Sequence, residues 1–517
     1  MTMFYTSVSM TAFDPTLGQI FVANDYVAAV GAPLSEVKNP ADLSTVGRIA
    51  QCVPASLDAV LQKAQAAQKD WAKLDGKSRA AALHKLADAM AAATAGPAAE
   101  LMTLEMGKPF TESVGELMNV GPIFRYFAEL ARDDGGFMAA PTAPNSTQFA
   151  RWYPYGVTAH IVPYNFPIIL MAFTVAASLA AGNAVVIKPA PATSLSTLAF
   201  MEHFKALPAG LVSCVTGGID TAKALINDER IGVVAFTGSV EAGRDVASAC
   251  GRLLKPCVIE AGGSDPMIVM DSAEPDVAAA AAVTGAFHLS GQICTSTERI
   301  YVHEKVHDAF VGAMVARTKN LRIGPGLGNV EIGPLVSEAA RAKVMRLVDQ
   351  AVAQGAKIAC GGRVPPAHNT GWFYEPTILT DVTPAMDLMQ AEMFGPVAPI
   401  VRVRDFDEAI ALANTSRFGL GAAIFTAKLD EAMAAIDRLE AGMVWVNNVL
   451  GDNDALPFGG WKLSGLGRAL SRLGLNAFRQ SKMVMLDHKA EVQSWWYPYS
   501  DAFYAERGGR WETEKKS

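Results

Sequence analysis

The first third of the chain places apolar residues at helical spacing. Between residues 56 and 95 they recur every three or four positions among Ala, Leu, Lys, Gln and Asp, which predicts two amphipathic helices. The same spacing predicts helices over residues 98–106 and 112–131, before Gly135 and Gly136 break the pattern. The apolar run of residues 168–181 is too short to cross a bilayer, so it predicts a buried helix.

Short apolar runs then alternate with helical segments. The predicted strands cover residues 184–187, 212–215, 233–236 and 256–260. A second alternation runs from Pro266 to about Phe425 and includes helices near residues 275–289, 304–318 and 337–354. Strands that alternate with helices are typical of doubly wound parallel sheets, so we predict an α/β fold.

Two segments depart from this alternation. Residues 147–154 and 156–161 flank the turn Pro154-Tyr155-Gly156 and predict a hairpin. The tail beyond about Ser481 is rich in aromatic residues between positions 495 and 499. We expect such a tail to dock on another surface, for example that of a neighbouring subunit.

Composition narrows the class of protein. The chain has 517 residues, of which 50% are hydrophobic and 18% charged, so we expect two or three lobes with a large core. The net charge of -7 and the lack of a long Lys/Arg block argue against nucleic acid and anionic membranes as partners. The first 14 residues hold no basic segment followed by an apolar one, and the six cysteines show no disulfide spacing, so we expect a cytoplasmic location.

One cysteine lies in a position that a small molecule can reach. Cys294 is in a small polar turn, residues 290–296, between an Ala-rich apolar run and a strand-like run. A lone cysteine is more often a small buried hydrophobe than a nucleophile. A catalytic interpretation therefore needs support from other segments.

Four motifs offer that support, and each has a structural alternative. Lys188 ends a strand and is either a ribose ligand or a solvated lysine. Gly238 and Ser239 begin a helix whose N–H groups attract a pyrophosphate, or they form an ordinary cap. Glu260 ends another strand and is either a base or half of a salt bridge. Asn165, between two prolines, either holds an oxyanion or satisfies turn backbone.

A possible zinc motif does not fit its sequence context. His303 and His307 have the H-E-x-x-H spacing of zinc proteases, which requires both histidines on one helical face. His303 instead ends a strand-like run, and only the residues after it look helical. We therefore expect no metal site.

The order of the motifs resembles that of a known family. The chain is similar to the NAD(P)-dependent aldehyde dehydrogenase superfamily from about Asn39 to about Lys482. The motifs that carry this resemblance are PYNFP (163–167), GNAVVIKP (182–189), FTGS (236–239), EAGG (260–263), GQIC (291–294), EMFGP (392–396) and PFGGWKLSGLGR (457–468).

The resemblance implies a role for each motif. Cys294 would attack the aldehyde, Asn165 would hold the oxyanion and Glu260 would activate the water that releases the acid. The implied cofactor residues are Lys188, Gly217, Gly238, Ser239, Gly243, Glu392 and Phe394. The implied substrate tunnel is lined by Phe166, Leu170, Phe173, Ile293, Thr295 and Phe458.

Departures from the family pattern leave alternatives open. Pro191 stands where many NAD-preferring members carry a ribose-binding Glu, so the cofactor is NAD or NADP. The loop of residues 451–454 brings two acids and no arginine to the tunnel mouth, which favours a neutral or weakly cationic aldehyde over a carboxylated one. The alternatives to a hydrolytic enzyme are a CoA-acylating dehydrogenase and a nucleotide-binding protein without turnover.

The resemblance also implies a subunit of three parts that assembles into a homodimer or homotetramer. Residues 1–133 and 153–262 would form a dinucleotide-binding domain, and residues 263–465 a catalytic domain. Residues 134–152 and 480–517 would form a bridging and oligomerisation element with the C-terminal tail.

Overall fold

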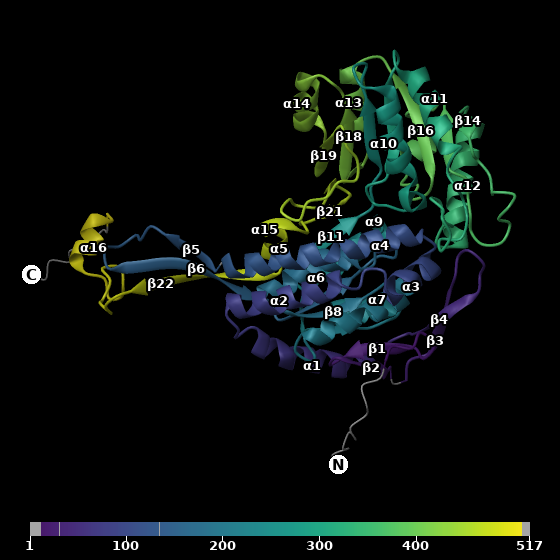
Figure 1. Ribbon diagram of the computed structural model, residues 1–517. Coiled ribbons are helices and arrows are strands. Elements are labelled where there is room, and N and C mark those ends of the chain that lie inside the picture. Colours follow the sequence, from purple (N-terminus) through teal and green to yellow (C-terminus); the bar gives the residue numbers. More distant parts are fainter. Residues whose placement is uncertain (1–11, 30, 134, 509–517) are drawn as a thin grey trace, which may run out of the picture. The chain divides into compact units, whose positions relative to one another are not determined.

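The computed structural model describes residues 12–29, 31–133 and 135–508 (Figure 1). These residues form two compact units. One comprises residues up to 133 with residues 154–480, and the other comprises residues 135–153 with residues from 481 onward. Most of the N-terminal stretch used to predict location, and the last nine residues of the tail, lie outside the described residues.

The first sheet of the large unit has eight strands. The five central strands, β9, β8, β7, β10 and β11, are parallel, and antiparallel strands complete both edges. In spatial order the strands are β2 (Asp25–Ala28), β1 (Gln19–Val22), β9 (Val212–Cys214), β8 (Ala184–Lys188), β7 (Val157–Ile161), β10 (Ile231–Gly238), β11 (Cys257–Ala261) and β21 (Gly465–Leu466). Every residue of β7 and β8 is buried, including the polar Thr158, His160 and Lys188, as expected for central strands that are covered on both faces.

The second sheet of the large unit has seven strands. All its pairs are parallel except β14 with β15. In spatial order the strands are β14 (Lys357–Cys360), β15 (Thr377–Thr380), β16 (Val397–Val403), β13 (Thr297–His303), β12 (Asp265–Val269), β18 (Gly421–Phe425) and β19 (Met443–Val446). The predicted α/β architecture with two parallel sheets is confirmed.

Helices of the large unit pack on these sheets (Figure 1). Those before the second sheet are α1 (Pro54–Trp71), α2 (Gly76–Ala91), α3 (Pro97–Met106), α4 (Phe110–Met118), α5 (Val120–Asp133), α6 (Ile169–Ala181), α7 (Ser194–Phe200), α8 (Ile219–Asn227) and α9 (Val240–Arg252). The later ones are α10 (Pro275–Phe287), α11 (His307–Thr318), α12 (Glu338–Ala353), α13 (Phe406–Asn414), α14 (Leu429–Arg438) and α15 (Ser471–Ala477). Within the described residues, no helix combines the length and the apolar content that crossing a membrane requires.

Short elements connect the larger ones. The short helices are η1 (Pro191–Thr193), η2 (Met201–Ala206), η3 (His288–Gly291) and η4 (Asp387–Met389). Two small antiparallel pairs are β3 (Leu34–Lys38) with β4 (Thr45–Ala50), and β17 (Phe418–Gly419) with β20 (Trp461–Lys462).

Two local predictions about the helices have clear outcomes. The run of residues 168–181 forms the buried helix α6, as predicted. The single helix predicted over residues 112–131 is instead two helices, because the chain leaves α4 at Asn119, whose side-chain amide donates to the Gly115 carbonyl at 2.9 Å.

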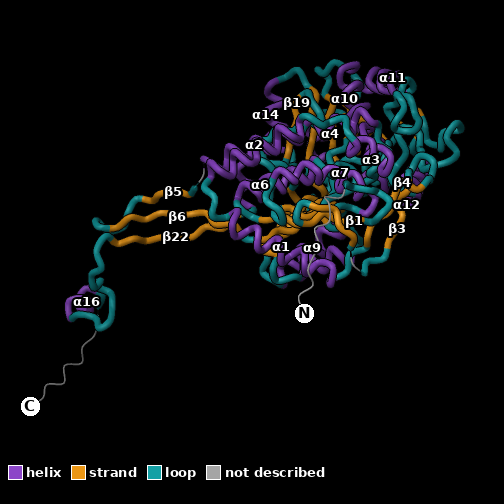
Figure 2. Tube along the Cα trace, turned by 60° about the horizontal axis from the view of Figure 1, so that its bottom comes forward, coloured by secondary structure: helices purple, strands orange, loops and turns teal. Residues whose placement is uncertain are grey.

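The small unit contains a three-stranded sheet and a short helix. Figure 2 shows β5 (Gly136–Ala139), β6 (Ser146–Pro154) and β22 (Arg479–Asp487) side by side, with β6 in the middle. The helix α16 (Asp501–Glu506) follows them along the chain. This unit combines the two segments that the resemblance assigns to a bridging element, and its role in assembly stays a prediction.

The predicted hairpin of residues 147–154 and 156–161 is wrong. β6 pairs with β5, whereas β7 lies between β8 and β10 in the first sheet. Burial explains the separation, because all five residues of β7 are buried and need a position covered on both faces. β6 is only partly buried and belongs to a small exposed sheet.

Candidate active site

The turn that carries Cys294 has an unusual backbone. Leu289 and Ser290 have φ values of 54° and 55°, and Gly291 follows with 71°, so three successive residues are left-handed. The Ser290 hydroxyl donates to the Gly333 carbonyl at 2.9 Å, and the Gln292 amide donates to the Leu289 carbonyl at 3.2 Å. A side chain at Gly291 would collide with the Gly395 carbonyl. Such strain persists only where the surroundings fix it, and it is typical of functional sites.

Cys294 itself is almost completely enclosed, with 9% of its surface exposed. Its carbonyl oxygen lies so close to Gly263 that any side chain there would collide with it. Burial raises the pKa of the Cys294 thiol well above its usual value, and the neighbouring Glu260 raises it further. The thiol is therefore protonated until a base or a positive charge arrives beside it.

Glu260 supplies a carboxyl group next to this thiol. It lies in β11, is 6% exposed, and neither of its oxygens has a hydrogen-bond partner within the described residues. Burial raises the pKa of Glu260 to about 8, so the group changes charge near neutral pH. Cys294 and Thr237 lie near enough to favour its ionised form, but they offset the burial only in part, which points to a role in proton transfer.

Asn165 lies on the other side of the nucleophile turn. Its side-chain amide donates to the Gln292 carbonyl at 2.9 Å, two residues before Cys294, and the residue is 2% exposed. This bond uses one of the two N–H groups of the amide and fixes its direction. Asn165 and Cys294 line the same cavity.

A buried ion pair supports Asn165, and the sequence analysis missed it. The ammonium group of Lys108 contacts the carboxylate of Glu116, and both side chains are fully buried. Lys108 also donates to the Asn165 carbonyl at 3.0 Å, while Glu116 accepts from the backbone N–H groups of Ile168 and Ile169 at 2.7 and 2.9 Å. A sequence signal existed, because Glu116 lies on the apolar face that continues through Val120.

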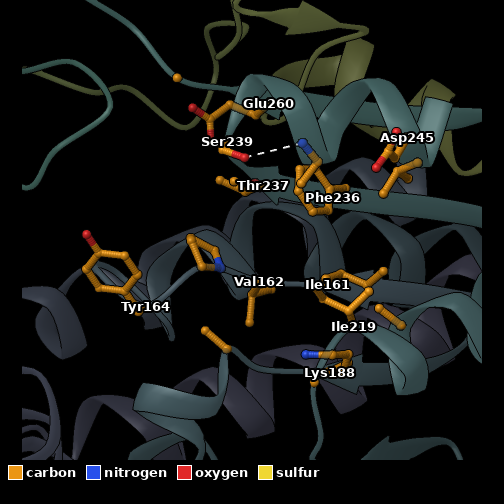
Figure 3. Close-up of a pocket in the computed structure, with 18 of the residues that line it drawn as sticks. Ile161, Val162, Tyr164, Lys188, Ile219, Phe236, Thr237, Ser239, Asp245 and Glu260 are labelled. Carbon is orange, nitrogen blue, oxygen red and sulfur yellow. Dashed lines mark hydrogen bonds between the residues drawn. The ribbon is translucent and has the colours of Figure 1, made fainter. Parts of the chain in front are cut away.

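A cavity of about 820 Å³, here called the sheet-edge cavity, opens at the carboxyl ends of the first sheet. In Figure 3, Lys188 lies on one side of it, and Phe236, Thr237 and Ser239 line the opposite side. Lys188 is 4% exposed and donates to the Pro189 carbonyl at 2.9 Å, and burial lowers its pKa to about 8. The Ser239 hydroxyl accepts from the Ala242 N–H at 3.3 Å and caps α9.

Most of the predicted cofactor residues lie in this cavity. Lys188, Gly238, Ser239, Glu392 and Phe394 line it, as do Asn165, Glu260 and Cys294. Gly217 and Gly243 do not. A side chain at Gly217 would collide with Thr221, and Gly243 packs closely on Ile259.

A third missed residue, Glu298, holds the loop that carries Glu392 and Phe394. The buried carboxylate of Glu298 accepts from the N–H groups of Met393 and Phe394 at 2.8 and 2.7 Å. Glu392 in turn accepts from the Gly263 N–H at 3.2 Å, and the Phe394 ring lies 5.9 Å from that of Tyr164. No local pattern marks Glu298, because its partners lie almost 100 positions along the chain.

A second cavity of about 850 Å³, here called the helix-side cavity, lies on the opposite side of Cys294. All six predicted tunnel residues line it: Phe166, Leu170, Phe173, Ile293, Thr295 and Phe458. The remaining lining comes mainly from α4, from the end of α10 and from loops near residues 321–332 and 450–452. Among the described residues, Cys294 is the one that lines both cavities.

The two histidines of the zinc-like motif lie on different elements. His303 is the last residue of β13 and His307 the first of α11, so they do not share a helical face. Within the described residues, no group of three or more His, Cys, Asp or Glu side chains has the arrangement of a metal site.

Comparison with known proteins decides the family. The family model described as the aldehyde dehydrogenase family matches residues 26–484. The chain belongs to the aldehyde dehydrogenase family. The predicted class, an NAD(P)-dependent aldehyde dehydrogenase, is thereby confirmed.

Individual members of the aldehyde dehydrogenase family are similar over almost the whole chain. A 3,6-anhydro-alpha-L-galactose dehydrogenase from Streptomyces coelicolor is 36% identical, with 90% of this chain and 96% of the relative covered. An NADP-dependent succinate-semialdehyde dehydrogenase from Mycolicibacterium paratuberculosis is also 36% identical, with 87% and 96% covered. A crystal structure of betaine aldehyde dehydrogenase from Staphylococcus aureus in complex with NAD+ has a TM-score of 0.89 at 28% identity, covering 93% and 97%.

Proposed function

We propose that this aldehyde dehydrogenase oxidises its substrate while the substrate is bound covalently to Cys294, and that it releases a free carboxylic acid. The observation that carries the proposal is the position of Cys294, the one described residue that lines both cavities. A nucleophile at such a junction can hold an aldehyde on one side and present its carbon to a cofactor on the other.

The first step forms the covalent bond. The Cys294 thiol gives its proton to Glu260, and the thiolate adds to the aldehyde carbon. The new oxyanion takes up hydrogen bonds from the free N–H of the Asn165 amide and from the Cys294 backbone N–H. Because Gln292 already orients that amide, little reorganisation is needed when the charge develops.

The remaining steps oxidise and release the substrate. Bound NAD(P)+ would accept the hydride that leaves the tetrahedral carbon, which converts the adduct into a thioester on the Cys294 sulfur. Glu260 gives the thiol proton to solvent and, once ionised again, takes a proton from water, and the hydroxide adds to the thioester carbon. Collapse of this adduct releases the carboxylic acid and returns the thiolate.

The residues of the sheet-edge cavity fit a dinucleotide. Lys188 would bond the adenosine ribose, the Gly238-Ser239 turn and the start of α9 would hold the pyrophosphate, and Glu392 with Phe394 would hold the nicotinamide ribose. A side chain at Gly238 would approach the Phe236 ring to 2.6 Å, so the bare backbone leaves the cavity wall open there. Gly217 and Gly243 would act by shaping the backbone behind the wall.

We propose that the enzyme accepts NAD or NADP. Pro191 lines the cavity near Lys188 and carries no carboxylate that would repel a 2′-phosphate. Both cofactors are represented among relatives, since the S. aureus structure contains NAD+ and the M. paratuberculosis enzyme is named for NADP+. We also propose that the enzyme is cytoplasmic and forms a homodimer or homotetramer through the small unit. Light scattering of the purified protein tests whether it is a dimer or a tetramer.

Product analysis with each cofactor tests the proposed reaction. An aldehyde panel is run with NAD and with NADP, and products are identified by mass spectrometry with and without CoA. We expect free acid in amounts equal to the reduced cofactor, whether or not CoA is present. Acyl-CoA in place of acid would support the CoA-acylating alternative, and cofactor binding without reduction would support the protein without turnover.

A further inference from the structure

The charges of the helix-side cavity point to a particular class of aldehyde. Besides Cys294, the ionisable residues that line this cavity are Glu112, Glu116, His288, Arg322, Glu331 and Asp452. Four of them are acids. The charge of one acid, Glu116, is neutralised by its buried ion pair with Lys108. The charge that a bound substrate meets therefore depends on the other ionisable residues.

The only arginine of this lining within the described residues is already paired. Arg322 contacts both carboxylate oxygens of Glu331, with its Nε at 3.2 and 3.1 Å, and its backbone N–H donates to the same carboxylate at 2.8 Å. A two-pronged pair of this kind occupies one edge of the guanidinium group and offsets its charge. A carboxylate on the substrate would therefore have to compete with Glu331.

Glu112 brings negative charge into the cavity from α4. Its Oε1 lies 3.0 Å from the His288 ring and accepts from the Leu289 N–H at 3.3 Å. Its Oε2 is buried and has no hydrogen-bond partner within the described residues. Gly115 and Glu116 of the same helix, and Asn119 just after it, also line the cavity, and the Glu112 side chain keeps 11% of its surface exposed.

Asp452 adds a second acid from the opposite loop. None of the described basic side chains forms an ion pair with it. Partial burial and the nearby Asp454 raise the pKa of Asp452 to about 6, so it is ionised at neutral pH. Its charge contributes to the raised pKa of the Cys294 thiol, which places it within electrostatic reach of the reacting end of the cavity.

Aromatic rings complete this surface. Phe166, Phe173, Phe287 and Phe458 line the same cavity, and the rings of Phe173 and Phe458 meet edge to face at 5.2 Å. Aromatic faces attract cations, above all ammonium groups that carry methyl groups. Acids and aromatic faces together favour a positive ligand and disfavour a negative one.

We propose that the preferred substrates are aldehydes that carry a cationic ammonium group at the end remote from the carbonyl. Glu112 and Asp452 recognise the charge, and the phenylalanine walls receive the chain and the methyl groups. This inference rests on the proposed function, because it places the carbonyl carbon at Cys294.

A matched pair of substrates isolates the charge. 4-(Trimethylammonio)butanal and 5,5-dimethylhexanal have the same shape and differ in one charged nitrogen against carbon, and succinic semialdehyde supplies the negative case. We expect kcat/KM for the cationic aldehyde to exceed that for its neutral counterpart by about 10- to 100-fold, the size of one or two charged contacts. Succinic semialdehyde should be the poorest of the three.

Variants connect the preference to the two acids. Glu112→Gln and Asp452→Asn should each reduce the cationic-to-neutral ratio of kcat/KM by about 5- to 20-fold. Glu331→Gln should leave the cationic preference in place. It should raise kcat/KM for succinic semialdehyde, because Arg322 then has no carboxylate partner at position 331. Glu100→Gln, on the exposed face of α3, is the matched control and should leave all three substrates unchanged.

The possible failures are distinguishable. A neutral or carboxylated aldehyde that is used as well as the cationic one overturns the cation preference and leaves the proposed reaction intact. A ratio that does not respond to either acid variant also overturns it. No cofactor reduction with any of the three, nor with hexanal or benzaldehyde, overturns the proposed function itself.

Discussion

The two cavities meet at Cys294 but are built from different parts of the fold. The sheet-edge cavity is lined by the ends of β7, β8, β10 and β11, by the turns that follow them and by one face each of α8 and α9. The helix-side cavity is lined by side chains of α4, α6 and α10 and by two distant loops. Its shape and charge therefore depend on side chains from segments far apart in sequence.

This difference separates the binding of a constant cofactor from the binding of a variable aldehyde. Strand ends and glycine turns offer backbone groups, and these serve a ligand that does not change between substrates. Helix faces and loops offer side chains, which can change without disturbing a sheet. We expect changes at the junction to stop the reaction between the two ligands, and changes on either side to affect the binding of one ligand only.

Removing the thiol at the junction should have the largest effect. We expect Cys294→Ala to lower aldehyde oxidation by on the order of 10⁴-fold or more, because the covalent route is lost. Cofactor affinity should stay near that of the wild type, which protein fluorescence titration measures. Near-normal oxidation would refute the nucleophile, and simultaneous loss of cofactor binding would show that the two cavities are not independent.

Glu260→Gln should separate oxidation from release. Steady-state turnover is expected to fall by about 10²- to 10⁴-fold, since water is no longer activated. A burst of reduced cofactor, close to one per active site, should remain but form more slowly, because Glu260 no longer takes the thiol proton, and mass spectrometry should find the acyl group on Cys294. Full steady-state turnover in this variant would contradict the role of Glu260.

The pH dependence of the wild type follows from the same residue. Only the ionised carboxylate accepts a proton from water, and burial raises the pKa of Glu260 to about 8. Turnover that is limited by hydrolysis should therefore increase as the pH is raised through about 8, and it should fall as the pH drops below that value. The Glu260→Gln variant should lack this rising limb.

Lys108→Met tests how the junction is supported. Removal of the cation leaves Glu116 charged and buried, which should lower the free energy of unfolding by about 3–5 kcal/mol. The Asn165 carbonyl also loses a donor, so we expect kcat to fall by about tenfold. Lys73→Met is the control, because Lys73 pairs with Asp70 at the surface and its loss should cost less than about 1 kcal/mol. Equal losses of unfolding free energy in the two variants would show that the buried ion pair contributes no more to stability than the surface pair.

Pro191→Glu tests the sheet-edge cavity alone. A carboxylate at this position should repel a 2′-phosphate and lower kcat/KM for NADP by about 10- to 100-fold. The kcat/KM for NAD and the order of aldehyde preference should stay unchanged. Pro191→Gln, similar in size but neutral, should keep the wild-type ratio of the two cofactors. A changed aldehyde preference in either variant would contradict the separation of the cavities.

The limits of the sequence analysis follow the same division. Cys294, Glu260 and Lys188 stand out because each ends or follows an apolar run at a strand edge or turn. Lys108, Glu116 and Glu298 were missed because their roles are defined by tertiary packing. The false hairpin arose because alternation alone does not show that β6 and β7 belong to different sheets.

Laboratory evolution of this protein toward new aldehydes is constrained by the contact between Gly263 and the Cys294 carbonyl. Any side chain at position 263 would displace the turn that carries Cys294. Residues 289–291 of this turn are already left-handed, so the backbone cannot easily adopt another conformation. A mutant library that targets this turn should therefore yield mainly inactive clones. Libraries at positions 112, 173 and 452 should hold the variants that gain substrates.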